Sequence, residues 1–227
     1  MTFSLLARCP RTGMLGMVVS SSSPAVAARC AHVAVGAGAA ASQNVTDPRL
    51  GMRMVELMAA GASAPEAVER AVEEAGGTAE HRQLAAVDSE GGTAGFSGGC
   101  TLGLHAVAAA EGVVAAGNLL AAGAVVDAMV RCFEQLDRPQ VHLGDRLVAG
   151  LVAGLEAGGE AGPVRSAGLL ICDRVPWPVA DLRVDWDDAP IGRLAELWGL
   201  WKPQLDDYVT RALDPAAAPR YGVAGDR

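Results

Sequence analysis

The pattern of apolar and polar positions along the chain predicts strands joined by tight turns and helices that come in pairs. Short apolar or alternating runs predict strands at residues 2–7, 15–21, 33–41, 83–87, 93–97, 113–116, 166–172 and 182–186. Apolar residues three or four apart predict helices at 48–60, 64–75, 124–136 and 143–157, a short helix at 25–30, and a last helix after Pro190. We therefore expect an α+β fold in which two largely antiparallel sheets stack face to face and helices cover both outer faces, a four-layer αββα sandwich.

Local signals mark the starts of several of these helices. Asp47 stands before Pro48 as an N-cap, and Ser63 with Glu66 forms a capping box. Four serines, residues 20–23, precede the short helix; they either cap it or present hydroxyl and N–H groups to an oxyanion. No linker interrupts the pattern, so we expect one domain over residues 1–227 with a C-terminal helical segment at about 190–213.

Composition and charge narrow the classes of function. Hydrophobic residues make up 51% of the chain, enough for a sizeable core, and the net charge is −8 with no basic cluster, which argues against nucleic acid or an anionic membrane as a partner. The five cysteines are an odd number and contain no C-x-x-C pair, as in reduced cytoplasmic proteins without structural zinc. There is no signal-peptide pattern and no long uninterrupted apolar run.

The start of the first strand carries the clearest candidate chemistry. Thr2 has a small side chain, so removal of Met1 is expected, which would leave a threonine with both a hydroxyl and a free α-amine. A threonine hydroxyl needs a base beside it to become a nucleophile, and an α-amine with a pKa of roughly 7.7–8 suits that role. The alternative is that Thr2 simply begins an edge strand.

Several motifs in order along the chain carry a family resemblance. They are Thr2-Phe3-Ser4, Gly16–Ser21, Ser42-Gln43 with Asp47-Pro48, Arg82-Gln83 before Val87-Asp88, Gly117-Asn118-Leu119-Leu120, Ser166–Leu170, and Asp181–Asp185 with Pro190-Ile191. With these motifs the chain resembles the bacterial family called domain of unknown function 1028, which is similar in fold to the N-terminal nucleophile (Ntn) hydrolases. The resemblance implies an αββα sandwich, supplies no established reaction, and by analogy places the nucleophile at Thr2.

The implied function is an Ntn-type amidohydrolase that acts on a small amide or peptide-like substrate without a cofactor. Its catalytic residues would be Thr2 and Asn118, and its substrate and oxyanion contacts would come from Ser21, Ser22, Gln43, Asn44, Asp47 and His105. Proteasome-like members use a lysine near the nucleophile, but the only lysine here is Lys202, so Arg29, Arg82 or the α-amine alone would serve. The alternative is a non-catalytic scaffold of the same fold that binds a small metabolite or a partner protein.

The remaining candidates give weaker signals. Cys100 follows two glycines without an identifiable histidine partner, although Ser21 or Cys100 stays open as an alternative nucleophile. Asp181, Asp185 and Asp187 would share one strand face, as a cation site or as a solvated surface. The four histidines lack metal-ligand spacing, and we expect no metal. The last helix, with Trp198 and Trp201, either covers the core or forms a homodimer interface.

Overall fold

Two stacked antiparallel sheets form the centre of the molecule, which is seen here as a computed structural model that describes residues 2–225. The six-stranded sheet has the order β10–β9–β2–β1–β8–β7 and the four-stranded sheet the order β3–β4–β5–β6. In the first sheet the strands are β1 (Thr2–Arg8), β2 (Leu15–Ser21), β7 (Ala106–Ala110), β8 (Val113–Asn118), β9 (Ser166–Cys172) and β10 (Ala180–Val184). In the second they are β3 (Ala31–Ala34), β4 (Gly38–Asn44), β5 (Arg82–Asp88) and β6 (Thr93–Ser97).

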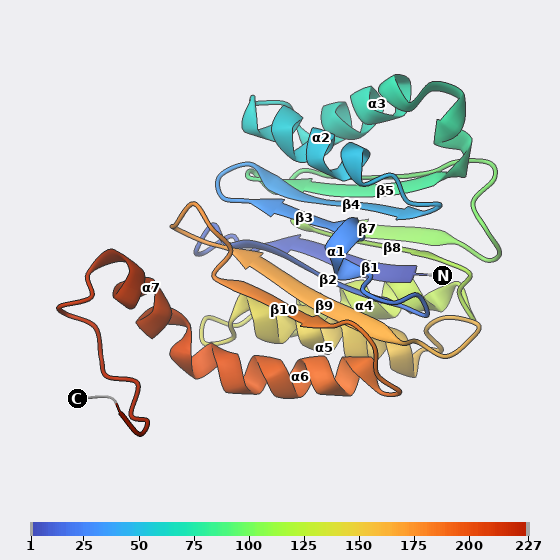
Figure 1. Cartoon of the computed structure of the whole chain (residues 1–227). Coiled ribbons are helices and arrows are strands. Elements are labelled where there is room, and N and C mark those ends of the chain that lie inside the picture. The colour runs from blue at the N-terminus through green and yellow to red at the C-terminus, as the bar shows by residue number, and fades with distance from the viewer. Residues whose placement is uncertain (1, 226–227) are drawn as a thin grey trace.

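Helices cover both outer faces of this pair of sheets (Figure 1). On the four-stranded sheet lie α2 (Pro48–Ala59) and α3 (Ala64–Ala75); on the six-stranded sheet lie α4 (Ala124–Gln135), α5 (Leu143–Glu156) and α6 (Pro190–Trp201). The other helical segments are α1 (Ala27–Cys30), η1 (Gly76–His81), η2 (Lys202–Gln204) and α7 (Leu205–Leu213). The predicted four-layer αββα sandwich is confirmed. No helix in residues 2–225 has the length and apolar character needed to cross a bilayer.

Between the two sheets, large side chains from one sheet meet small ones from the other. The six-stranded sheet contributes Leu6, Met17 and Val19, and the four-stranded sheet contributes mostly alanines such as Ala39 and Ala85. Small residues let the second sheet approach closely, since close packing leaves no room for two facing rows of large side chains. The Ala-rich and Gly-rich composition of the chain therefore shapes the interface on which the candidate site depends.

Three strand predictions need correction. Residues 33–41 do not form one strand: β3 and β4 make a hairpin whose turn contains Gly36 at a φ of +69°, a conformation that favours glycine. The alternating Ala, Val and Gly of this stretch gave no turn signal. The edge strand β7 was missed because it consists almost wholly of alanine, a poor strand former. Strand β10 begins two residues before the predicted 182–186.

The C-terminal helix α6 is anchored to α5 by a buried tryptophan. The indole N–H of Trp198 donates to Asp145 at 2.8 Å, and the Trp198 ring lies against Gly144 in the first turn of α5. Trp201 is also held, since its indole donates to the Val179 carbonyl at 2.9 Å. These contacts show that both tryptophans help to cover the core.

Replacing Gly144 with alanine should therefore destabilise the protein. A Cβ at Gly144 would stand 2.4 Å from a carbon of the rigid Trp198 ring. The expected loss from overpacking is about 1–3 kcal/mol, and it outweighs the gain in helix propensity of at most about 1 kcal/mol. The matched control is Gly199→Ala in α6, where no atom lies within 4 Å and a small gain is expected. Urea unfolding of both variants measures the difference, and equal effects would contradict this account of the packing.

Candidate active site at the start of the first strand

Thr2 is the first residue of β1, which lies between β2 and β8 in the six-stranded sheet. All three strands carry a polar residue at this level. In the register of β1 with β8, Asn118 is directly opposite Thr2. In the register of β1 with β2, Phe3 is opposite Ser20, so Ser21 flanks Thr2 on the other side. The Thr2 hydroxyl lies 3.4 Å from that of Ser21 and donates to it. The fold thus brings together three predicted site residues that are far apart in the sequence.

The side chain of Thr2 points into the sandwich. Phe3 packs in the core beneath α4 and α5, so strand alternation places Thr2 and Ser4 on the opposite face, toward the four-stranded sheet. Thr2 is only 5% exposed, and Ser4 is fully buried. Met1, whose removal the sequence predicts, lies outside the described residues. A polar pair on this inner face needs partners from the second sheet, because burial without hydrogen bonds is costly.

Those partners centre on Gln83, a fully buried residue of β5. Its Oε1 accepts from Gln43 Nε2 at 2.8 Å and from Asn118 Nδ2 at 3.0 Å. Its Nε2 donates to the Ser97 hydroxyl at 3.0 Å and to the Gly117 carbonyl at 2.9 Å. Gln83 thus uses its full hydrogen-bonding capacity and joins the two sheets beneath the candidate site.

The Gly117 carbonyl fixes the direction of the whole network. A carbonyl only accepts, so the amide group of Gln83 that faces it must be the NH2, and Gln83 Oε1 must face the other way. Gln43 and Asn118 must then present NH2 groups to Gln83, and Gln43 Oε1 is left to accept from the Ser4 hydroxyl at 2.9 Å. The orientation of the Asn118 amide follows from this chain of bonds.

Asn118 consequently holds a buried acceptor oxygen, Oδ1, that has no hydrogen-bond partner. Such an atom is uncommon in a folded protein and costs about 1–3 kcal/mol. Because Asn118 is the cross-strand neighbour of Thr2, this oxygen is available to an N–H donor that arrives beside Thr2. The arrangement favours an amine or a substrate N–H at this point.

The backbone N–H groups that follow Ser21 already donate hydrogen bonds within the protein. The Ser22 N–H donates to both carboxylate oxygens of Glu160, at 3.1 and 3.2 Å, and the Ser23 N–H donates to the Ser21 hydroxyl at 3.1 Å. These two N–H groups, which the sequence suggested as oxyanion donors, therefore already have acceptors within the protein. The cap residue of α1 is Val26, without a side-chain bond.

Glu160 reaches Ser22 from the loop between α5 and β9. Its backbone forms an antiparallel bridge with Leu120, and the next N–H, that of Ala161, donates to Leu119 at 2.9 Å. The side chain is 5% exposed, and burial raises the pKa of this carboxyl to about 7. A carboxyl that titrates near neutral pH, one residue from the Thr2–Ser21 pair, is a functional candidate that the sequence did not single out.

Glu160 should make the stability of the protein fall as pH rises. Its pKa is raised in the folded state above the roughly 4.3 expected for an unfolded chain, so the folded state binds the proton more tightly between about pH 4.5 and 7. The free energy of unfolding should therefore lose about 1–3 kcal/mol across that window. The positive charge at the N-terminus acts in the opposite direction and lowers this pKa, but burial has the larger effect.

Urea unfolding at pH 5 and pH 8 gives the change in the free energy of unfolding with pH for each protein. The contribution of Glu160 is the change in the wild type minus the change in Glu160→Gln. Glutamine keeps one oxygen for the Ser22 N–H and removes the titration. The exposed Glu156→Gln on the same segment should keep the wild-type pH dependence. An identical pH dependence in the wild type and Glu160→Gln would contradict the raised pKa.

Three further predicted site residues have local structural roles. The Asn44 amide donates to the His81 carbonyl at 2.7 Å and accepts from the Leu102 N–H at 3.2 Å. Asp47 caps α2 by accepting from the Arg49 N–H at 3.1 Å. His105 is exposed, with its Nδ1 3.1 Å from the Gly103 carbonyl. The described contacts do not join any of the three to Thr2, so they are weaker candidates than Gln43, Ser21 and Asn118.

No candidate side-chain base is found close to Thr2 among the residues proposed for that role. Lys202 forms an ion pair with Asp145 at 2.6 Å. Arg29 donates to the Pro24 carbonyl at 2.6 Å, and Arg82 donates to the Val45 carbonyl at 2.6 Å. Each is engaged by these contacts in its own loop or helix end.

The acidic residues near β10 are matched by arginines. Asp185 pairs with Arg183 at 3.1 Å, and Asp188 pairs with Arg165. Strand β10 ends at Val184, so the alternation expected for Asp185 and Asp187 does not extend to them. In residues 2–225 no group of three or more His, Cys, Asp or Glu side chains is arranged to hold a metal ion. Cys100 is exposed.

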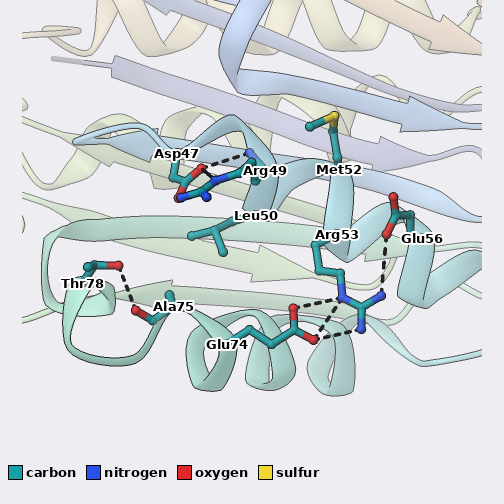
Figure 2. A pocket seen from close by; sticks show the side chains of 9 residues that line it. All are labelled: Asp47, Arg49, Leu50, Met52, Arg53, Glu56, Glu74, Ala75 and Thr78. Atoms are coloured by element: carbon teal, nitrogen blue, oxygen red, sulfur yellow. Dashed lines mark hydrogen bonds and ion pairs between the residues drawn. The ribbon is translucent and has the colours of Figure 1, made fainter.

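A cavity of about 490 Å³ lies between α2 and α3, in a different layer from Thr2. Figure 2 shows that its charged side chains face one another. Arg53 pairs with Glu74 at 2.9 Å, and Arg49 folds back on Asp47 at 2.8 Å. Arg53 also pairs with Glu56 at 3.6 Å, so each charged side chain in the wall has a partner within the protein, although three carboxylates share two arginines.

Two residues that matter at the site were missed from the sequence, for different reasons. Gln83 is the second residue of β5 and is followed by four apolar residues, and this polar position before a buried run was the available signal. Glu160 stands in a glycine-rich loop, where a glutamate is indistinguishable from a solvated one. Both depend on contacts with residues more than thirty positions away, which no local pattern reports.

Comparisons with known proteins agree with this fold. The chain is similar to the crystal structure of protein SPO2555 from Silicibacter pomeroyi, a DUF1028 protein, with 29% identity, 93% of each chain covered and a TM-score of 0.82. A more distant similarity is to Anbu (ancestral beta-subunit) from Yersinia bercovieri, with 12% identity, 92% and 97% of the chains covered and a TM-score of 0.40. No curated protein matches the chain. The model of the family of unknown function DUF1028 matches residues 2–194, and the chain belongs to that family.

Proposed function

We propose that this protein is an N-terminal nucleophile amidohydrolase in which Thr2 attacks a small amide or peptide-like substrate. The observation that supports this most directly is the placement of the Thr2 hydroxyl. It is buried at the start of β1, 3.4 Å from the Ser21 hydroxyl and directly across the sheet from Asn118. The activity requires that the peptide bond before Thr2 be cut, which creates the α-amine that acts as base.

The reaction uses one proton carrier. The α-amine takes the proton from Thr2 Oγ1 as that oxygen attacks the substrate carbonyl carbon. The tetrahedral intermediate then collapses, its C–N bond breaks, and the ammonium returns the proton to the leaving amine. Water attacks the resulting acyl ester with the same amine as base, which releases the acid and restores Thr2. The step needs no cofactor and consumes only water.

Asn118 has two parts in this proposal. Its unpartnered Oδ1 accepts a hydrogen bond from the α-ammonium and so orients the amine toward Thr2 Oγ1. Its Nδ2 uses one hydrogen for Gln83, and the second hydrogen is the proposed oxyanion donor. The Ser22 and Ser23 N–H groups are excluded from that role because they already donate to Glu160 and Ser21.

A non-catalytic scaffold is the second candidate function. The near-complete burial of Thr2 favours it, since a nucleophile that is 5% exposed needs an opening before a substrate reaches it. In that case the same inner face would bind a small metabolite through the Asn118 acceptor and the Gln83 network without covalent chemistry.

The intact mass of protein expressed without an N-terminal tag tests the proposal first. A chain that begins at Thr2 has the required amine, and incubation with a β-lactone probe should then add one probe mass, mapped to Thr2 by peptide sequencing. A chain that keeps residues before Thr2 and forms no adduct would exclude the Thr2 mechanism. A chain that begins at Thr2 without an adduct, but binds ligands, would favour the scaffold.

A further inference from the structure

Strand β7 leaves one edge of the six-stranded sheet open. It is the last strand in the sheet order and pairs on one side only, with β8. One face of β7 packs on the core beneath α4 through Ala106, Ala108 and Ala110. On the other face, Val107 lies against Gly95 of β6. Both faces of the strand are therefore covered, while its outer edge can pair with a further strand.

The hairpin that joins β7 to β8 fixes which backbone groups point to this edge. Only two residues lie between the paired Ala110 and Val113, so this closing pair must exchange its hydrogen bonds within the hairpin. Bonded and non-bonded positions alternate along an antiparallel ladder. The N–H and C=O groups of Val107 and Ala109 therefore point away from β8, toward the open edge.

The edge of β7 lacks the devices that keep other edge strands from pairing. Edge strands are usually protected by charges, prolines or bulges, or by being very short. In this protein β10 carries the charged Asp181 and Arg183, and β3 has only four residues. The edge strand β6 has Gly95 at its centre, which weakens it as a strand. In contrast, β7 has five residues, AVAAA, without a charge or a proline.

Apolar side chains are exposed beside the same edge. The segment before β7 continues along it: the Leu102 carbonyl accepts from the Leu119 N–H at 3.0 Å, and the Leu104 carbonyl accepts from the Leu120 N–H at 2.9 Å. Leu102 and Leu104 are each 49% exposed, and Val107 is 39% exposed. Exposed apolar side chains that gather in one place are typical of protein–protein contact surfaces.

The strand is complementary to a second copy of itself. When two copies run antiparallel about a two-fold axis at Ala108, Val107 of each copy lies opposite Ala109 of the other. Every outward N–H and C=O group of β7 then has a partner. The same register places His105 opposite Glu111 of the second copy, because both residues are three positions from Ala108. A histidine thus faces a carboxylate on each side of the axis, as cross-strand pairing favours.

We propose that the protein forms a two-fold symmetric homodimer in which β7 pairs antiparallel with β7 of a second copy. The pairing joins the two six-stranded sheets into one continuous sheet. The exposed Leu102 and Leu104 lie at the border of the contact, where their burial adds to the backbone hydrogen bonds. The dimer does not depend on the chemistry proposed for Thr2, because no residue of β7 takes part in it.

The mass of the full chain in solution tests the dimer first. In about 0.15 M salt, which screens the charge of −8 on each copy, sedimentation equilibrium at up to about 100 µM protein should give twice the 23.1 kDa of one chain. Ala109→Pro should be monomeric, because proline removes an outward N–H and leaves the bonds to β8 in place. A monomeric wild type, or a dimer that persists in Ala109→Pro, overturns the proposal.

A charge reversal tests the register without changing the backbone of β7. At pH 6, where histidine side chains are mostly protonated, His105→Glu places like charges opposite each other on both sides of the axis. It should weaken dimerisation about tenfold. Adding Glu111→Lys to His105→Glu restores opposite charges, and the dissociation constant should return to within about threefold of the wild-type value.

The matched control adds Glu196→Lys to His105→Glu instead. Glu196 is exposed on α6, which covers β9 and β10 at the other side of the sheet, so this variant has the same net charge without a charge at the contact. Dimerisation should stay weak in it. Equal affinity of the wild type and His105→Glu, or equal rescue by Glu196→Lys and Glu111→Lys, overturns the proposed pairing.

Discussion

Thr2→Ala should abolish covalent labelling by a β-lactone, with a rate at least about 10³-fold below that of the wild type, as for removal of other hydrolase nucleophiles. Thr2→Ser should keep labelling within about tenfold, because the attacking oxygen and the α-amine are both retained. The physical reason is that the hydroxyl at position 2 is the atom that forms the bond. Time-resolved mass spectrometry of the adduct measures all three rates.

Ser21→Ala serves as the neighbouring control in that experiment. It removes the hydroxyl that now accepts from Thr2 and lies 3.4 Å away, but it leaves the nucleophile in place. We expect slower labelling that still maps to Thr2, with the loss in rate smaller than for Thr2→Ala. Labelling of Thr2→Ala at the wild-type rate would redirect the assignment to Ser21 or Cys100.

Gln83→Leu should cost about 4 kcal/mol or more in the free energy of unfolding. Leucine is close to glutamine in size, but it deprives Gln43 and Asn118 of their acceptor and the Gly117 carbonyl of its donor. Each buried group left without a partner costs about 1–3 kcal/mol, and partial relaxation lowers the sum. The urea concentration at the midpoint of unfolding should be lower for Gln83→Leu than for the wild type, and the slope of the free energy against urea should be unchanged.

The matched control for this loss is Gln135→Leu. Gln135 is the last residue of α4 and is exposed, so its replacement should change stability by no more than about 0.5 kcal/mol. A cost below about 1 kcal/mol for Gln83→Leu would show that the amides of Gln43 and Asn118 find other partners. That result would also remove the argument for the acceptor at Asn118 Oδ1.

The sequence was most informative where structure is decided locally. The caps at Asp47 and Ser63 and the helices that follow them are confirmed nearly to the residue, because a cap depends on atoms within one turn. The hairpin of β3 and β4 was missed because its turn, Val35-Gly36-Ala37, has an apolar residue on each side of the glycine and no polar turn residue. Strand β7 gains its structure from pairing with β8, which no local signal reports.

The candidate site was predictable only in part. Thr2 and Asn118 could be named one by one, but their position opposite each other depends on a strand register that spans 116 residues of sequence. Asn44 and Asp47 are polar residues at the ends of strands and helices, and in the structure they have the turn and cap roles that such residues most often have. Gln83 and Glu160 act through tertiary contacts alone.

The carbonyl of Gly117 has a consequence for how this family can vary. Since it dictates which end of each amide faces which neighbour, Gln83, Gln43 and Asn118 cannot change independently of one another. A relative that replaces Gln83 with a residue lacking an NH2 group must also supply new partners at the other two positions. These three positions and Ser4, whose hydroxyl donates to Gln43, should therefore covary across relatives. The four hydrogen bonds that join them to one another and to the Gly117 carbonyl would be inherited together.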